Sequence, residues 1–139
     1  MVYEIPCKNC NSKYIGETGR VFKTRLEEHR KEVEQEDRER KFTRSEKCTN
    51  QGTVYKSAVT DHVMHENHVI DWEGAKVIDH ESYMRSRHVR EAIWIRRNKP
   101  AVLNRDEGAF QLSHLYDQVF AAPPSGRLHR QGGATSNLQ

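Results

Sequence analysis

The sequence lacks any long apolar run and is poor in hydrophobic residues overall. Only 35% of its 139 residues are hydrophobic, and the mean hydropathy is −0.96. No stretch approaches the length of apolar residues that a membrane span needs, and no apolar N-terminal run marks a signal peptide. The length suits one small domain. We therefore expect a small core, of the kind that a metal ion or a disulfide often supplements.

Cysteine is also scarce. The chain has three cysteines, an odd number. Without a signal peptide this count favours a reducing, intracellular compartment, where metal coordination is commoner than disulfide formation. Cys7 and Cys10 form a C-x2-C pair in a polar turn, whereas Cys48 stands alone and is predicted to be a free thiol without a role.

Neither sign of charge dominates the chain. Twenty-three Lys and Arg residues against 20 Asp and Glu residues give a net charge of +3. The basic residues crowd two segments, 20–44 and 85–105. Basic faces of this kind suit a polyanion such as nucleic acid, but the interspersed acidic residues are also typical of ordinary solvated helix faces. Charge alone leaves both interpretations open.

Hydrophobic patterning predicts an α/β (α+β) domain with a small three-stranded, mainly antiparallel sheet and three main flanking helices. The predicted strands are residues 2–5, 13–15 and 75–78, and the predicted helices are residues 21–36, 54–66 and 82–98. Residues 37–52 are almost wholly polar and are predicted to be a loop or a frayed helix end. Residues 121–139 have the composition of a disordered tail, which leaves 1–120 as the domain.

The cysteine pair has the spacing of a zinc knuckle, and two thiolates need two further ligands to complete a tetrahedron. His62 and His68 are separated by five residues, a spacing that suits a shared metal if the helix ends between them. We rank Cys7, Cys10, His62 and His68 first, with His65 as a substitute for either histidine. The alternative is buried cysteines and an ordinary core histidine. Four protein ligands leave no open position, so the predicted Zn²⁺ is structural.

A second group of polar residues suits chemistry on a phosphodiester. Tyr3 and Tyr14 lie on the paired strands, Arg25 on the first helix, Glu91 on the third helix and Asn104 in the turn after it. A carboxylate can hold a divalent ion that polarises a phosphate, an arginine can neutralise developing charge, and a tyrosine or its bound water can act as a base. Each residue alone is more often a packing or surface residue.

Several separated runs, in the right order, resemble the GIY-YIG nuclease domain. KYIGETGR at 13–20 and KTRLEEH at 23–29 resemble the second half of its motif region, and Val2-Tyr3 matches the end of the first motif, with Met1-Val2 where the motif has Gly-Ile. REAIWI at 90–95 and LNR at 103–105 resemble its helix glutamate and late asparagine. The Cys and His residues, with SAV at 57–59 and NKP at 98–100, resemble the endonuclease domain of Penelope-like retroelements in particular.

This resemblance, over roughly residues 2–120, implies a role for each matching residue. Tyr14 and Tyr3 would line the active site, one of them taking part in proton abstraction from water. Arg25 would steady the scissile phosphate, and His29 would support it or shuttle a proton. Glu91 would ligate a single catalytic Mg²⁺ or Mn²⁺.

The resemblance also implies that Asn104 positions the backbone of the site. The expected product is a DNA nick with a free 3′ hydroxyl, which in such retroelements can prime reverse transcription. The implied setting is nuclear, with DNA and an upstream reverse transcriptase domain of the same polyprotein as partners and no membrane. Candidate contacts to the DNA backbone are Lys13, Arg20, Lys23, Arg87, Arg90, Arg96 and Arg97.

Two competing hypotheses remain. One is a non-catalytic, zinc-dependent nucleic-acid-binding module whose tyrosines only pack or stack, and the other is a catalytically inactive remnant. The nuclease hypothesis requires that the phenol of Tyr14, the guanidinium of Arg25 and the carboxylate of Glu91 converge around one phosphate-sized hollow.

Overall fold

The computed structural model describes residues 1–42 and 55–121. Its elements follow the chain in the order β1 (Val2–Pro6), β2 (Lys13–Glu17), α1 (Phe22–Phe42), α2 (Ala58–Glu66), β3 (Lys76–Asp79), α3 (Met84–Asn98), the 3-10 turn η1 (His114–Tyr116) and α4 (Asp117–Ala121). The predicted tail beyond residue 121 and part of the predicted loop, residues 43–52, lie outside the described residues. Among the described helices, none has the length and apolar character to cross a membrane.

The three strands form one antiparallel sheet, as predicted, and the structure places them in the order β2-β1-β3. The central strand β1 pairs Tyr3 with Gly16 and Ile5 with Tyr14 of β2. Side chains alternate between the faces of a strand. This alternation sends Tyr3 and Ile5 to one face of the sheet and Val2 to the other, and all three are fully buried.

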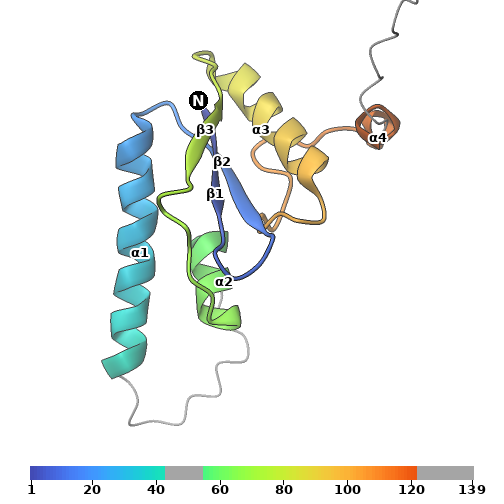
Figure 1. The fold of residues 1–139 in the computed structure, drawn as a ribbon. Helices are drawn as coiled ribbons and strands as arrows, with labels where there is room; N and C mark the ends of the chain where they lie inside the picture. Colours follow the sequence, from blue (N-terminus) through green and yellow to red (C-terminus); the bar gives the residue numbers. More distant parts are fainter. Residues whose placement is uncertain (43–54, 122–139) are drawn as a thin grey trace, which may run out of the picture.

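Each face of the sheet has its own core, as the arrangement of α1 and α3 on opposite sides shows (Figure 1). On one face, Tyr3 and Ile5 pack with Val59 of α2, against partly buried residues of α1. On the other face, Val2 and Ile15 pack with Ile95 of α3. The small hydrophobic content is thus divided over two thin layers, which limits how much each layer can stabilise the fold.

The helices differ from the expectation in extent and number. α1 runs on to Phe42, six residues beyond the predicted end at residue 36. α2 begins at Ala58 rather than at 54, because the Ser57 hydroxyl caps it by accepting a hydrogen bond from the Thr60 amide at 3.2 Å. Asn67 ends α2 in the left-handed conformation, with φ of 55°. The five-residue helix α4 adds a fourth helix to the three main ones that were predicted.

Candidate functional site

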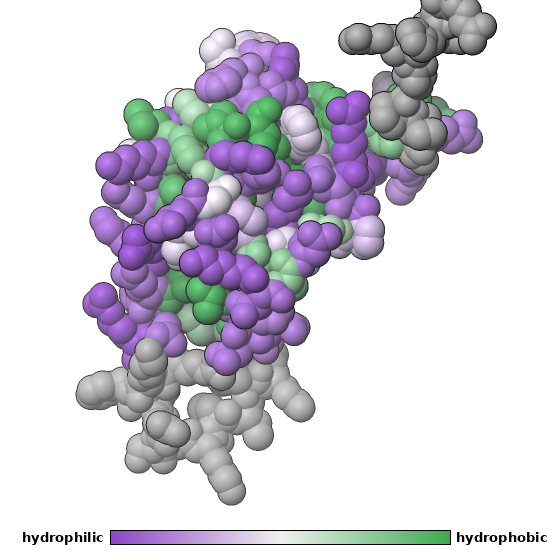
Figure 2. All heavy atoms as spheres, viewed as in Figure 1, coloured by the Kyte–Doolittle hydropathy of each residue, from purple (hydrophilic) through white to green (hydrophobic). Residues whose placement is uncertain are grey.

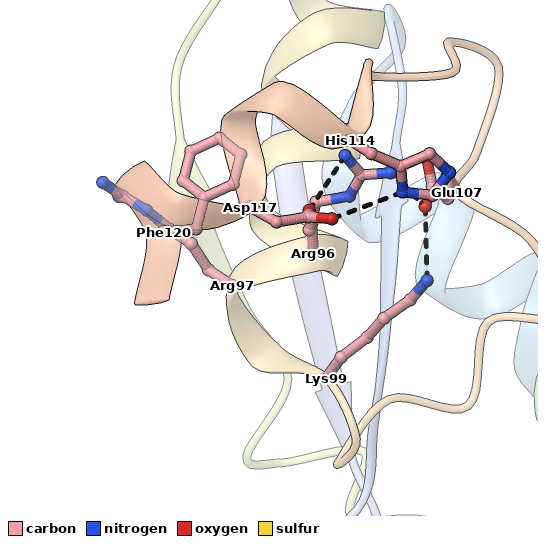
Figure 3. A pocket seen from close by; sticks show the side chains of 7 residues that line it. All are labelled: Arg96, Arg97, Lys99, Glu107, His114, Asp117 and Phe120. Carbon is pink, nitrogen blue, oxygen red and sulfur yellow. Dashed lines mark hydrogen bonds and ion pairs between the residues drawn. The ribbon is translucent and has the colours of Figure 1, made fainter. Parts of the chain in front are cut away.

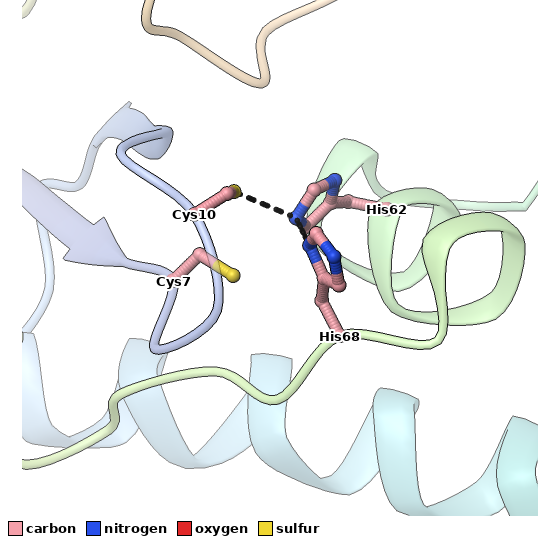
Figure 4. Close-up of side chains that lie close together, drawn as sticks. All are labelled: Cys7, Cys10, His62 and His68. Carbon is pink, nitrogen blue, oxygen red and sulfur yellow. Dashed lines mark hydrogen bonds between the residues drawn. The ribbon is translucent and has the colours of Figure 1, made fainter.

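The turn between β1 and β2 brings two cysteines to two histidines at the end of α2 (Figure 4). The ligand atoms of Cys7, Cys10, His62 and His68 all lie within 4.8 Å of one another. Cys10 Sγ is 3.5 Å from His62 Nε2, and His68 Nδ1 is 3.1 Å from that same nitrogen. The left-handed turn at Asn67 ends the helix between the two histidines, which lets the chain bring His68 back toward His62.

These distances fit a tetrahedral metal site. Bonds of about 2.3 Å to sulfur and 2.0 Å to nitrogen place the ligand atoms of a zinc tetrahedron about 3.3–3.8 Å apart. The group can therefore hold a metal ion such as zinc. His65 does not belong to this group: its Nδ1 lies 2.9 Å from the carbonyl oxygen of Asp61, and nearly half of its side chain is exposed. The choice of His62 and His68 over His65 agrees with this geometry.

The backbone around the turn holds the two cysteines in place. The Lys8 amide donates to the Val69 carbonyl at 2.8 Å, and the Val69 amide donates to Asn9 Oδ1 at 2.7 Å. Hydrogen bonds from Ser12 lower the pKa of the Cys10 thiol to about 7, whereas burial raises the pKa of Cys7. The thiolate is the metal-binding form, so Cys10 is prepared for coordination near neutral pH.

A separate hollow of about 260 Å³ lies where β2, α1, α3 and the start of α2 meet. Tyr14, Arg25 and Glu91 all line it, so the structure brings together the three groups that the nuclease hypothesis requires. Asn104 lines it as well. The complete set of lining residues is Tyr14, Arg25, Lys56, Ser57, Ala58, Glu91, Asn104, Arg105, Asp106 and Gly108.

Glu91 carries the most unusual carboxylate of the hollow. The residue is 7% exposed, and no ion pair to it occurs within residues 1–42 and 55–121. Burial raises its pKa to about 7, against the opposing effect of a hydrogen bond from the Ala109 amide. Gly108 covers the carboxylate with φ of +83°, and a Cβ there would lie 2.7 Å from Glu91 Oε2. The site thus keeps a buried carboxylate that is not ion-paired to any side chain in the described part of the chain.

Tyr3 and His29 do not line this hollow. Tyr3 is fully buried and His29 is 1% exposed, and the Tyr3 hydroxyl lies 3.0 Å from His29 Nε2. Burial, followed by the nearby Arg25 charge, lowers the pKa of His29 to about 4, and burial raises the pKa of Tyr3. His29 Nδ1 is buried without a hydrogen-bond partner among the described residues. The two residues form a layer behind Tyr14, whose ring centroid lies 5.3 Å from that of His29.

The backbone of β2 is held close to both phenols. A Cβ on Gly16 would lie 2.6 Å from the Tyr3 hydroxyl and 2.8 Å from Cε1 of Tyr14, so only glycine fits between the rings. The Asn104 amide bridges to Ile15, accepting from its N–H at 3.0 Å and donating to its carbonyl at 2.7 Å. Asn104 therefore fixes the strand on which Tyr14 is carried.

Most of the predicted DNA-contacting cations are paired with carboxylates. Ion pairs join Lys13 to Glu4, Arg20 to Glu28, Arg87 to Glu17, Arg90 to Asp79 and Arg96 to Glu107. The side chains of Arg87 and Arg96 are only 8% and 7% exposed. Arg97 stacks over the Phe120 ring at 5.7 Å, and Lys23 is exposed. Contact between these side chains and the DNA backbone stays a prediction, and the burial of Arg87 and Arg96 leaves little of either side chain accessible for it.

A larger hollow of about 390 Å³ lies between the end of α3 and the η1–α4 segment (Figure 3). Its charges are satisfied within the chain, because Arg96 pairs with both Glu107 and Asp117 while Lys99 pairs with Glu107. The residues proposed for catalysis do not line it, although Arg96 and Arg97 of the predicted DNA contacts do. Although this hollow is larger than the one lined by Tyr14, Arg25 and Glu91, its size alone does not make it the candidate active site.

Sequence reasoning missed the contribution of α2 and of the loop after Asn104 to the hollow. Lys56 and Arg105 line it from these two segments, and neither was singled out in advance. The available signal was that Lys56 directly precedes the SAV run and that Arg105 is the last residue of the LNR run, both of which carry the resemblance. Comparison of the chain with family models, curated proteins and solved structures gives no match.

Proposed function

We propose that this domain is a divalent-metal-dependent DNA endonuclease that nicks one strand and leaves a 3′ hydroxyl. One observation carries the proposal: Tyr14, Arg25 and Glu91 line a single hollow. A phenol, a guanidinium and a carboxylate around one cavity are the groups that hydrolysis of a phosphodiester uses. As part of the same proposal, the domain resembles the GIY-YIG class and its Cys2His2 group holds a structural zinc ion.

Glu91 is the residue that would hold Mg²⁺ or Mn²⁺. Its buried carboxylate lacks a cationic partner in the described part of the chain, and hard oxygen ligands are those that these ions prefer. When bound, such an ion stabilises charge on the phosphate and on the leaving oxygen. It would also favour the ionised form of Glu91, whose pKa burial raises to about 7.

The remaining groups bind and orient. Arg25 places its positive charge at the hollow, where it can neutralise charge on the phosphoryl oxygens. Burial raises the pKa of Tyr14, so its hydroxyl stays protonated at neutral pH and orients the attacking water by a hydrogen bond. Water attack on phosphorus then gives a 5′ phosphate, and the water proton passes to the departing 3′ oxygen. In a retroelement, that 3′ end would serve a reverse transcriptase domain of the same polyprotein.

A plasmid-nicking assay tests the proposal. We expect the parent protein to convert supercoiled DNA to nicked circles with Mg²⁺ or Mn²⁺, and Glu91→Ala to lose at least on the order of 10²-fold in rate. Glu73→Ala is the matched control, because it removes an exposed carboxylate outside the hollow. Equal rates for the parent and Glu91→Ala would refute the assignment of that residue.

The same experiment distinguishes the nuclease from the competing hypothesis of a non-catalytic binding module. If neither protein cuts but both bind DNA with a steep salt dependence, the domain is a non-catalytic zinc-dependent binding module. Metal analysis of the purified protein belongs beside it, with one Zn²⁺ per chain as the expected result. An absence of metal would contradict the structural-zinc part of the proposal.

A further inference from the structure

The loop of residues 104–108 contacts three other elements at once. Asn104 bridges to both backbone groups of Ile15 on β2. The Glu107 carboxylate accepts from the guanidinium of Arg96 on α3 at 2.5 Å. Gly108 closes over the Glu91 carboxylate. This loop therefore forms one wall of the hollow and is attached to the strand and to the helix that carry Tyr14 and Glu91.

Arg105 attaches the same loop to α2. Its Nη2 donates to the Tyr55 carbonyl at 2.8 Å and lies 3.3 Å from Asp61 Oδ1. Asp61 immediately precedes the metal-cluster residue His62. α2 is thus fastened to the β1–β2 turn through the Cys2His2 group and to the loop through Arg105.

The start of α2 is itself part of the hollow. Lys56, Ser57 and Ala58 line it together with Glu91 and Arg105. A shift of α2 relative to the loop would therefore move one wall of the cavity against the other. Arg105 links the two walls directly, because it reaches from the loop to the carbonyls of Tyr55 and Ser57 before the helix and to Asp61 in its first turn.

We propose that Arg105 is a positioning residue of the hollow, which holds the metal-cluster helix α2 against the loop that carries Asn104. This inference rests on the proposed nuclease function. A guanidinium suits the role because its fork of donors can reach carbonyl oxygens and a carboxylate together, whereas a lysine ammonium is a single point charge. Arg105 does not replace the chemistry of Arg25; it sets the geometry in which that chemistry occurs.

The expected signature is a loss in kcat with little change in KM. Misplacement of a catalytic group by about 1 Å can lower a rate on the order of 10²-fold. Binding of the DNA substrate depends on contacts spread over more of the protein, so KM should stay within about threefold of the parent value. We expect Arg105→Ala to lose on the order of 10- to 100-fold in kcat and Arg105→Lys to fall between it and the parent.

The test is steady-state nicking of a duplex in Mg²⁺ by the full chain and its variants. Arg30→Ala is the matched control, since Arg30 is an exposed arginine that pairs with Glu34 and lies outside the hollow. Zinc content and amide hydrogen exchange are measured on the same samples. In Arg105→Ala the amides of Ile15 and Thr60 should exchange faster while zinc stays at one per chain, because each amide donates to a side chain at the two ends that Arg105 joins.

Each outcome decides the matter. A kcat for Arg105→Ala equal to that of Arg30→Ala would overturn the inference, and so would loss of zinc from Arg105→Ala, because the residue would then act on folding. A parent protein that does not nick DNA would instead refute the proposed function. Hydrogen exchange would still show in that case whether Arg105 fastens the two walls, and unchanged exchange would refute the fastening itself.

Discussion

Glu91 combines deep burial with a carboxylate that no described cation neutralises, and this gives it a measurable effect on stability. Its pKa rises to about 7 in the folded protein from an ordinary value of 4.5, chiefly through burial. Between these two pH values the folded state binds more protons than the unfolded state. The contribution of Glu91 to the free energy of unfolding therefore falls as pH rises through this window, by roughly 3 kcal/mol at most.

Glu91→Gln should remove this dependence. We expect the difference in the free energy of unfolding, variant minus parent, to increase between pH 5 and pH 8 in the absence of Mg²⁺. The comparison must be a difference, because His29, with its pKa lowered to about 4, makes the parent more stable as pH rises toward 6.5. Urea denaturation of both proteins at the two pH values measures it. A difference that is the same at pH 5 and pH 8 would contradict the assigned cause.

Gly16 shows how one missing side chain sets the distance between two phenols. An added Cβ would lie 2.6 Å from the Tyr3 hydroxyl and 2.8 Å from the Tyr14 ring, so Gly16→Ala must displace at least one ring. Overpacking of this kind costs about 1–3 kcal/mol. Gly19→Ala is the control, because its Cβ would meet only the end of the Arg87 side chain, at 3.1 Å. Thermal denaturation of both variants should show the larger loss for Gly16→Ala.

At the scale of the elements, sequence reasoning succeeded where periodicity is strong and local. The alternation around Tyr3 and Tyr14 predicts both strands, and the apolar stripe of α3 predicts that helix to within about two residues at its start. α1 runs beyond its apolar stripe because its charged residues are good helix formers and its polar side chains pair along the surface, as Gln35 and Glu39 do. The polar run has no apolar stripe, so the sequence left a loop and a frayed helix end as alternatives and did not fix where the helix ends.

The sequence likewise predicts only part of the candidate site. Tyr14, Arg25 and Glu91 were grouped from the sequence, because the elements that carry them are recognisable. The position of Tyr3 behind the hollow was not foreseen, since the face to which a strand residue points is known only once the helices are placed. Lys56 and Arg105 lie at the hollow because of where α2 packs, and the SAV and LNR runs beside them do not by themselves determine that packing.

The position of α2 should depend on the Cys2His2 group. α2 has nine residues, too few for a stable helix in isolation. Besides the contacts of α2 with α1 and the packing of Val59 on β1, the metal group links α2 to the β1–β2 turn. Structural zinc in small domains contributes on the order of 10 kcal/mol of apparent binding energy. Removal of the metal should therefore release α2 before the sheet.

The variant Cys10→Ser tests this dependence. We expect it to lose the zinc and to show faster amide exchange at Val63 and Met64, which lie in the interior of α2, while the amides of β1 stay protected. Cys48→Ser, which removes a thiol that is not one of the four, should keep one zinc per chain. The same protection at α2 with and without metal would show that packing on α1 is sufficient to hold it.

For the whole molecule, the net charge is only +3, so neither basic nor acidic residues dominate. Hydrophilic side chains cover most of the face in Figure 2, with hydrophobic ones gathered mainly in its upper half. Many arginines are paired with carboxylates, as Arg20, Arg87 and Arg90 are. Paired cations release few counterions on meeting DNA. Affinity should thus depend on the few cations that remain available beside the hollow.

Lys56 is such a cation, because it is exposed, lines the hollow and has no ion pair among the described residues. Each phosphate that a lysine neutralises contributes about −0.9 to the slope of log K against log salt concentration. We expect Lys56→Ala to reduce the magnitude of that slope by about 0.9 in a fluorescence anisotropy titration of duplex DNA with Ca²⁺ in place of Mg²⁺. Lys76→Ala removes the same charge from a residue paired with Glu4 and should leave the slope nearly unchanged. If both variants lower the slope equally, DNA responds to the overall charge of the domain, and the hollow is not where its backbone binds.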